Sequence, residues 1–175
     1  MRPAETRPGG PDFVHLRLHT EYSLVDGIVR VPKLMEAVAA AGMPAVALTD
    51  QGNLFAMVKF HREAEKRGVK PLIGADLWLA DGSDRGEPAL LTLLVQDTGG
   101  FRNLTRLVSR SYLEGQDRGR PLVARDWLDA DSTAGLIALS GGVHGDVGRA
   151  LLAGRAGEAE ALLAGWQSLF GDRYY

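Results

Sequence analysis

Short apolar runs alternate with amphipathic stretches along most of the chain, and this alternation limits the fold more than any single motif does. The runs that suit strands lie at 44–50, 70–80, 89–97 and 135–141. Helices are expected at 31–43, 53–67 and 101–114, and in two short pieces around Gly154 to Gly157 within 146–170. Strands that alternate with helices predict an α/β fold with a mostly parallel sheet, open or closed into a barrel.

The segment FVHLRLHTEYSLVDG, residues 13–27, resembles the start of a metal site. Its first seven residues alternate between apolar and largely polar side chains, as in a strand with His15, Arg17 and His19 on one face. Two histidines at this spacing could share a metal ion, with Asp26 as an oxygen ligand beyond the turn. Arginine cannot coordinate a cation, so the pattern leaves open a metalloenzyme or a site that has lost its metal.

Other polar residues fall at the ends of the expected strands, where α/β proteins place functional groups. They are His19, Asp50, Asp76 and the SGG turn at 140–142. In TDQGNLF (49–55), Gly52 permits a tight turn and Asn53 is expected to cap the following helix. For His61, within an expected helix, and His144, in a glycine-rich turn, a surface position is favoured over a role as ligand.

The composition is that of a soluble globular protein with one domain. The chain has 175 residues, no cysteine and a net charge of −2, which excludes thiolate chemistry and gives no basic footprint for DNA. Residues 1–12 form a polar leader rich in proline and glycine, without the apolar region of a secretory signal. No apolar run approaches the roughly 20 residues that span a bilayer. A cytoplasmic location is expected.

Four ordered segments bear a family resemblance that extends over residues 13–175. The segments HLRLHTEYSLVDG, ALTDQGNLFAMVKFHREAEKRGVKPLIGAD, LLTLLVQDTGGFRNLTRLVSRSY and GLIALSGGVHGDVGRALLAG resemble the polymerase-and-histidinol-phosphatase (PHP) domain. They are most similar to the form of this domain at the N-terminus of bacterial DNA polymerase III alpha subunits. The resemblance implies a distorted βα barrel with metals at the C-terminal ends of its strands. This chain would supply an incomplete, N-terminal portion of that barrel.

The resemblance also implies where the ligands of an intact metal site would fall. The corresponding positions here are Arg17, His19, Asp26, Asp50, Gln51, Asp76, Leu90 and Gly142. Arg17, Gln51 and Leu90 stand where the family pattern has histidine. Asp76 stands in place of glutamate, and Gly142 in place of cysteine or histidine. Further family ligands lie beyond residue 175, so we expect a degenerate site without metal ligands or catalytic residues.

Arg17 suggests what replaced the metal. Without cations, Asp26, Asp50 and Asp76 would repel one another, and a guanidinium can neutralise and hydrogen-bond carboxylates. We therefore predict that Arg17 occupies the former metal space and pairs with Asp26 or Asp76.

The resemblance implies a non-catalytic role in DNA replication, within a DNA-directed DNA polymerase, a nucleotidyltransferase. The expected partners are the rest of the alpha subunit, a separate proofreading exonuclease subunit, and DNA through the holoenzyme. No cofactor is expected for this chain, while Mg²⁺ would serve the polymerase domains. The alternative is an active phosphoesterase or 3′–5′ exonuclease with Zn²⁺ or Mn²⁺, in which Asp50, Gln51 and His144 compensate for the lost ligands.

Overall fold

The computed structural model describes residues 13–80 and 87–175, so the expected leader at 1–12 lies outside the described residues. The described residues form two compact units. The first ends at Ala75 and the second comprises Asp76–Tyr175. Of the helices among the described residues, none is long and apolar enough to cross a membrane.

The first unit is a small α/β layer. Its elements are α1 (Val31–Ala40), β1 (Ala45–Leu48), α2 (Met57–Lys66) and the first half of β2 (Lys70–Leu79). Strands β1 and β2 are parallel, with Ala45 opposite Lys70. Proline at the beginning of α1 fits there because the first turn of a helix needs no backbone donor.

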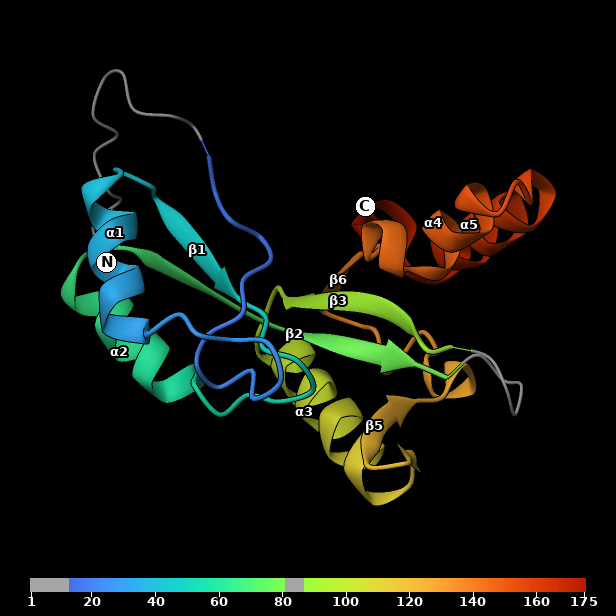
Figure 1. The fold of residues 1–175 in the computed structure, drawn as a ribbon, viewed down its shortest axis with the longest axis horizontal. Helices are drawn as coiled ribbons and strands as arrows, with labels where there is room; N and C mark the ends of the chain where they lie inside the picture. Colours follow the sequence, from blue (N-terminus) through green and yellow to red (C-terminus); the bar gives the residue numbers. More distant parts are fainter. Residues whose placement is uncertain (1–12, 81–86) are drawn as a thin grey trace. The chain divides into compact units, whose positions relative to one another are not determined.

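Helices α1 and α2 lie beside β1 and the first half of β2 (Figure 1). They bury their apolar stripes in a core shared with β1. Met35 from α1, Leu48 from β1 and Phe60 from α2 belong to this core and are almost completely buried. Burial of a side chain of this size stabilises a fold by about 1.5–3 kcal/mol. The core therefore fixes the C-terminal end of β1, where Asp50 follows.

The second unit contains the remaining strands and helices. They are β3 (Ala89–Val95), α3 (Thr98–Leu113), β4 (Gln116–Asp117), β5 (Arg120–Val123), β6 (Leu136–Leu139), α4 (Asp146–Leu152) and α5 (Ala156–Phe170). Short 3-10 helices lie at Arg125–Trp127, Gly142–His144 and Gly171–Arg173. The strand order is β4-β5-β2-β3-β6.

The pairing of these strands is mixed. Strand β2 pairs with β5 in parallel, whereas β3 with β6 and β4 with β5 are antiparallel. Helix α3 packs on β3, β5 and β6, and Asp97 caps it by accepting a hydrogen bond from the Gly100 N–H at 2.8 Å. The predicted α/β class is confirmed, and the predicted helices and most predicted strands are present within a few residues. Closure into a barrel stays a prediction.

The strand expected at 13–19 is wrong. This segment runs beside β1, because the Ala47 N–H donates to the His15 carbonyl at 2.8 Å and the Thr49 N–H to the Leu18 carbonyl at 3.0 Å. The Leu18 N–H, however, donates to the Thr49 hydroxyl oxygen instead of a backbone carbonyl. A side chain thus takes the place of a backbone partner, and no regular strand forms at this edge.

A short hairpin formed by β4 and β5 was not expected either. The polar sequence of residues 115–121, GQDRGRP, is typical of a loop, but strands flank a turn in which Arg118 and Gly119 both have positive φ, 48° and 80°. Positive φ at both central residues is the geometry of a two-residue hairpin turn. Arginine is not a typical residue for the first of these positions, which is why the sequence did not reveal the turn.

Candidate functional site

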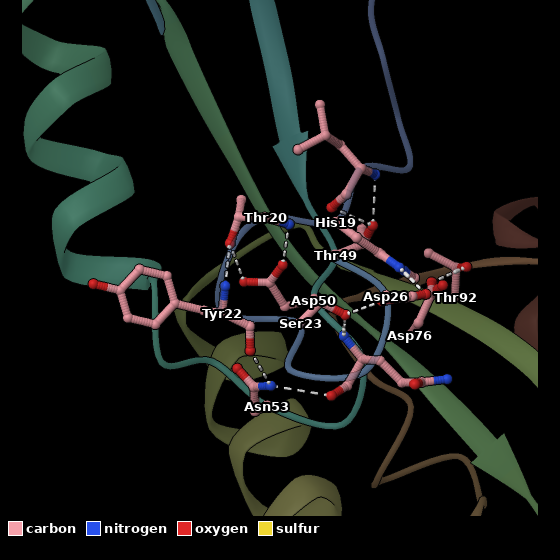
Figure 2. A network of polar contacts seen from close by, with 12 residues as sticks. His19, Thr20, Tyr22, Ser23, Asp26, Thr49, Asp50, Asn53, Asp76 and Thr92 are labelled. Carbon is pink, nitrogen blue, oxygen red and sulfur yellow. Dashed lines mark hydrogen bonds and ion pairs between the residues drawn. The ribbon is translucent and has the colours of Figure 1, made fainter. Parts of the chain in front are cut away.

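Asp50 anchors the turn at residues 20–27, which directly follows the opening segment, residues 13–19. It comes just after β1, is fully buried, and accepts hydrogen bonds from the Thr20 N–H at 2.6 Å and the Thr20 hydroxyl at 2.8 Å (Figure 2). Burial raises the pKa of Asp50 above its usual value, and the two bonds from Thr20 partly oppose this effect. Each carboxylate oxygen of Asp50 therefore already has a donor from the protein.

His19 and Asp26, the two ligand positions that match the family pattern without change, contact each other. Nδ1 of His19 lies 2.8 Å from Oδ2 of Asp26, and the Ser23 hydroxyl donates to Oδ1 of Asp26 at 2.7 Å (Figure 2). Burial acts to raise the pKa of Asp26, but the hydrogen bonds from Ser23 and His19 and the nearby positive charges outweigh it. The pKa of Asp26 is consequently lowered.

Arg17 is exposed, and its charge is one of those that lower the pKa of Asp26. The predicted pairing of Arg17 with Asp26 or Asp76 is not tested by this electrostatic effect and stays a prediction.

Gln51 contributes its backbone to the turn that contains Ser23, because its N–H donates to the Ser23 hydroxyl at 3.1 Å. The sequence thus predicted that Asp26, Asp50 and Gln51 belong to one site, but it did not predict that hydroxyl groups hold the turn.

The prediction that Asn53 caps the next helix is wrong. Helix α2 begins at Met57, and its N-cap residue, Ala56, has no side-chain hydrogen bond. Asn53 instead accepts a hydrogen bond from the Phe55 N–H at 3.0 Å and donates to the Tyr22 carbonyl at 3.0 Å. Its side chain joins two turns, and Gly52, with φ of 65°, allows the tight turn that was predicted.

The second unit holds the other positions at which the family pattern places ligands. Asp76 on β2 is fully buried and accepts a hydrogen bond from the Thr92 hydroxyl at 2.5 Å. Leu90 is buried at the start of β3, as an apolar side chain should be. Gly142 is exposed with φ of 55°, next to Gly141, whose Cα faces the Leu90 carbonyl. The structure therefore brings Leu90 and the SGG turn together.

The remaining histidines occupy surface positions, as predicted for His61 and His144. His61 on α2 is exposed and lies 3.4 Å from Glu65 one helical turn later. His144 is exposed in the 3-10 helix after β6. The ring of His15 packs edge-on against Phe13, with 4.8 Å between the ring centroids. None of these contacts resembles a metal centre.

The described residues show no cluster of metal ligands. Across residues 13–80 and 87–175, no group of three or more histidine, cysteine, aspartate or glutamate side chains is arranged to hold a metal ion. Instead, hydroxyl groups of Thr20, Ser23 and Thr92 donate to the carboxylates. Sequence reasoning missed these residues because it searched for ligands, although Thr20 and Ser23 lie within the opening motif. In the first unit, the hydrogen bonds from Thr20 and Ser23 hold the turn at residues 20–27.

Comparison with known proteins places the chain in a family. The model of the PHP domain matches residues 15–175. The chain belongs to the PHP domain family.

Relatives of this chain include much longer proteins. The chain is 52% identical over 163 residues to DNA polymerase III subunit alpha of Pseudomonas aeruginosa, covering 93% of this chain and 14% of that protein. It is 42% identical over 165 residues to DNA polymerase III subunit alpha of Escherichia coli, covering 94% of this chain and 14% of that protein. Among solved structures, an amidohydrolase from Chromobacterium violaceum matches with a TM-score of 0.45 and 20% identity, over 56% of this chain and 32% of that chain.

Proposed function

We propose that this chain is the N-terminal PHP domain of a DNA polymerase III alpha subunit and acts in bacterial DNA replication. The identity to alpha subunits over more than nine tenths of the chain supports this assignment. The chain spans 14% of those relatives, so the polymerase activity itself would belong to other parts of the protein. On this proposal, residues 13–175 are the beginning of the PHP domain.

We further propose that the domain has lost its metal centre and is not catalytic. One observation carries this proposal: the oxygen atoms that would bind a metal in the first unit are already hydrogen-bonded to the protein. Asp50 is bonded to Thr20, and Asp26 to Ser23 and His19. A metal ion would have to compete with these donors for the carboxylates, and neutral residues at Gln51, Leu90 and Gly142 offer little in return.

Arg17 supports the same reading of the site. The family pattern has histidine there, whereas this chain places a permanent positive charge whose influence reaches Asp26. A guanidinium supplies the charge that carboxylates need when no cation is bound. The residual role of the domain is then structural: to stabilise the polymerase and to present a docking surface to the proofreading exonuclease subunit.

The metal content of the intact polymerase subunit tests this function. The subunit is dialysed against Zn²⁺ or Mn²⁺ and analysed for bound metal, and hydrolysis of a model phosphodiester is measured beside the His19→Ala variant. We expect less than stoichiometric metal in this domain and the same background hydrolysis in both proteins. Stoichiometric metal together with hydrolysis that disappears in His19→Ala would establish the active phosphoesterase instead.

Assembly with the exonuclease subunit is tested separately. Binding of the purified exonuclease subunit to the intact polymerase subunit is measured by surface plasmon resonance, and a polymerase that lacks residues 1–175 serves for comparison. The proposal expects binding to the intact subunit and a large loss on truncation. Equal binding to both proteins would remove the docking role from this domain, provided that the truncated protein still extends primers.

A further inference from the structure

The turn after the opening segment exposes aliphatic side chains to an unusual degree. Leu24, Val25 and Ile28 are 79%, 88% and 90% exposed, respectively. Turns are normally built from polar residues and glycine, and isolated exposed apolar side chains are common. Three nearly fully exposed aliphatic residues within a single turn are different, because they contribute almost nothing to the core of their own unit. Such groupings mark surfaces that bind other molecules.

This turn is held in one conformation. The Ser23 N–H donates to the Thr20 carbonyl at 2.9 Å, and the N–H groups of Asp26 and Gly27 donate to the Ser23 carbonyl at 3.1 and 2.8 Å. A Cβ at Gly27 would lie 1.7 Å from the Thr20 carbonyl oxygen, so only glycine permits this approach. The Tyr22 N–H, which donates to the Thr20 hydroxyl oxygen, and the Ser23 hydroxyl, which donates to Asp26, tighten it further. A fixed turn loses little conformational entropy when it binds a partner.

A second apolar segment lies beside the turn. The Asn53 side chain is hydrogen-bonded to the Tyr22 carbonyl and to the Phe55 N–H, which places residues 53–55, just before α2, next to the turn. Phe55 is 63% exposed and Val58 is 53% exposed. We group the exposed apolar residues of the two segments under one name, the apolar turn surface: Leu24, Val25, Ile28, Phe55 and Val58.

The charges beside this surface are unevenly paired. Within residues 13–75, the side chain of every aspartate and glutamate contacts a polar or charged side chain. Asp50 accepts a hydrogen bond from Thr20. The other five lie within ion-pair distance of a base: Glu21 of Lys59, Asp26 of His19, Glu36 of Lys33, Glu63 of Arg67 and Glu65 of His61. Arg30 and Arg62 have no carboxylate within ion-pair distance among the described residues. Arg30 follows the turn directly, and Arg62 lies one helical turn after Val58.

We infer that the apolar turn surface binds a segment of a partner protein that carries apolar side chains flanked by carboxylates. The aliphatic side chains and Phe55 supply the apolar contacts, and Arg30 and Arg62 supply the charge that selects acidic neighbours. This inference rests on the proposed function, in which the partner is the proofreading exonuclease subunit. It adds to that proposal the residues that make the contact and the chemistry of the segment they accept.

The experiment uses the intact polymerase subunit and the purified exonuclease subunit. A triple variant, Leu24→Ser with Val25→Ser and Ile28→Ser, is compared with wild type by surface plasmon resonance. Loss of central apolar contacts should weaken binding about tenfold or more. Primer extension and the unfolding temperature should not change. The matched control is Leu151→Ser with Leu152→Ser, which removes exposed leucines from α4 and should bind as wild type does.

A charge reversal tests the chemistry of the segment. Arg30→Glu with Arg62→Glu should also weaken binding, and the affinity of the variant should fall less with added salt than that of wild type. Arg102→Glu with Arg106→Glu, two exposed arginines of α3 without a carboxylate partner among the described residues, should leave the affinity unchanged.

The outcomes separate this inference from the function on which it rests. If wild type does not bind the exonuclease subunit, the proposed docking role fails, and the inference with it. If wild type binds and the triple variant binds equally well, the inference is wrong and the docking role stands. A triple variant that unfolds earlier and extends primers poorly shows that the polymerase's own chain covers this surface. A wild type that dimerises through it, as detected by sedimentation, shows that a second copy does. Either result overturns the inference.

Discussion

Nδ1 of His19 lies 2.8 Å from Oδ2 of Asp26, so two residues that match the ligands of the PHP family are bonded to each other. The bond ties the end of the opening segment to the last part of its turn. It uses one nitrogen of the imidazole and one oxygen of the carboxylate, while Ser23 occupies the other oxygen. The pair thus stabilises the turn that carries the apolar turn surface.

Asp26→Asn should destabilise the chain at neutral pH but not in acid. The pKa of Asp26 is lower in the folded protein than its usual 3.8, so its stabilisation is fully present above the unfolded value and is lost as pH falls through the folded value. Because the side chain is 47% exposed, solvent screens the interaction. We expect a loss of about 0.5–1 kcal/mol in unfolding free energy at pH 7, by urea denaturation.

Repeating the titration in acid provides the check on this prediction. As pH falls below 3.8 and through the folded pKa of Asp26, the urea midpoints of wild type and Asp26→Asn should converge, because the carboxyl becomes protonated. Glu36→Gln serves as the comparison for an exposed ion pair, since Glu36 contacts Lys33 on α1 and the hydrogen bond from Lys33 also lowers its pKa. A difference between wild type and Asp26→Asn that is as large at pH 3 as at pH 7 contradicts the electrostatic explanation.

Asp50 has the opposite dependence on pH. Burial raises its folded pKa above 3.8, so the stability that its proton contributes is fully present below the unfolded value and disappears as pH rises through the folded value. Asp50→Asn keeps an oxygen for the Thr20 N–H and offers an NH₂ donor to the Thr20 hydroxyl oxygen. It should change the unfolding free energy at pH 7 by less than about 1 kcal/mol.

Asp50→Ala is the contrasting variant. It leaves the Thr20 N–H and hydroxyl buried without their acceptors, which should cost about 2–3 kcal/mol at pH 7. Relative to Asp50→Asn, wild type should gain stability as pH is lowered from 7 toward 4, because only wild type carries the carboxyl with the raised pKa. Chemical denaturation at several pH values measures both effects. If Asp50→Ala and Asp50→Asn prove equally stable, the bonds to Thr20 do not hold the turn.

Sequence patterns predicted the fold class because apolar periodicity reports burial directly. The run at 44–50 lies in the core as β1, and the amphipathic stretch at 53–67 contains α2 with Phe60 buried. Periodicity could not show which backbone groups are paired. The segment at 13–19 has the alternation of a strand, yet the Thr49 hydroxyl takes the place of a carbonyl beside it. Side-chain hydrogen bonds of this kind have no periodic signal.

The candidate site was predicted as a set of positions but not as a set of contacts. Motif matching selected His19, Asp26 and Asp50, and the first two do meet. It did not select Thr20 or Ser23, because threonine and serine are frequent in any turn and only the three-dimensional arrangement gives each carboxylate its donor. The apolar turn surface was not predicted from the sequence for a related reason, because the exposure of Ile28 depends on the three-dimensional conformation of the turn.

Thr92→Val should destabilise the second unit through Asp76. The Thr92 hydroxyl donates to the buried Asp76 carboxylate at 2.5 Å, and valine has a similar shape without a donor. Leaving a buried polar group without its hydrogen-bond donor costs about 1–3 kcal/mol. Thr92→Ser keeps the hydroxyl and should cost less, by the loss of a single methyl group. Thermal unfolding of both variants measures the difference, and equal melting temperatures would show that this hydroxyl does not support Asp76.

Adjacent glycines in the SGG turn should respond differently to alanine. A Cβ at Gly141 would lie 2.4 Å from the Leu90 carbonyl oxygen, and the backbone there has φ of 73°. Gly141→Ala thus combines a clash with backbone strain and should cost at least about 2–3 kcal/mol. At Gly142, with φ of 55°, a Cβ meets no atom within 4 Å, so Gly142→Ala bears only the strain of about 1–2 kcal/mol. Gly142→Asn should cost less still, because asparagine tolerates positive φ. Urea unfolding of the three variants gives the order. Equal costs for Gly141→Ala and Gly142→Ala would mean that the turn does not pack against Leu90 in solution.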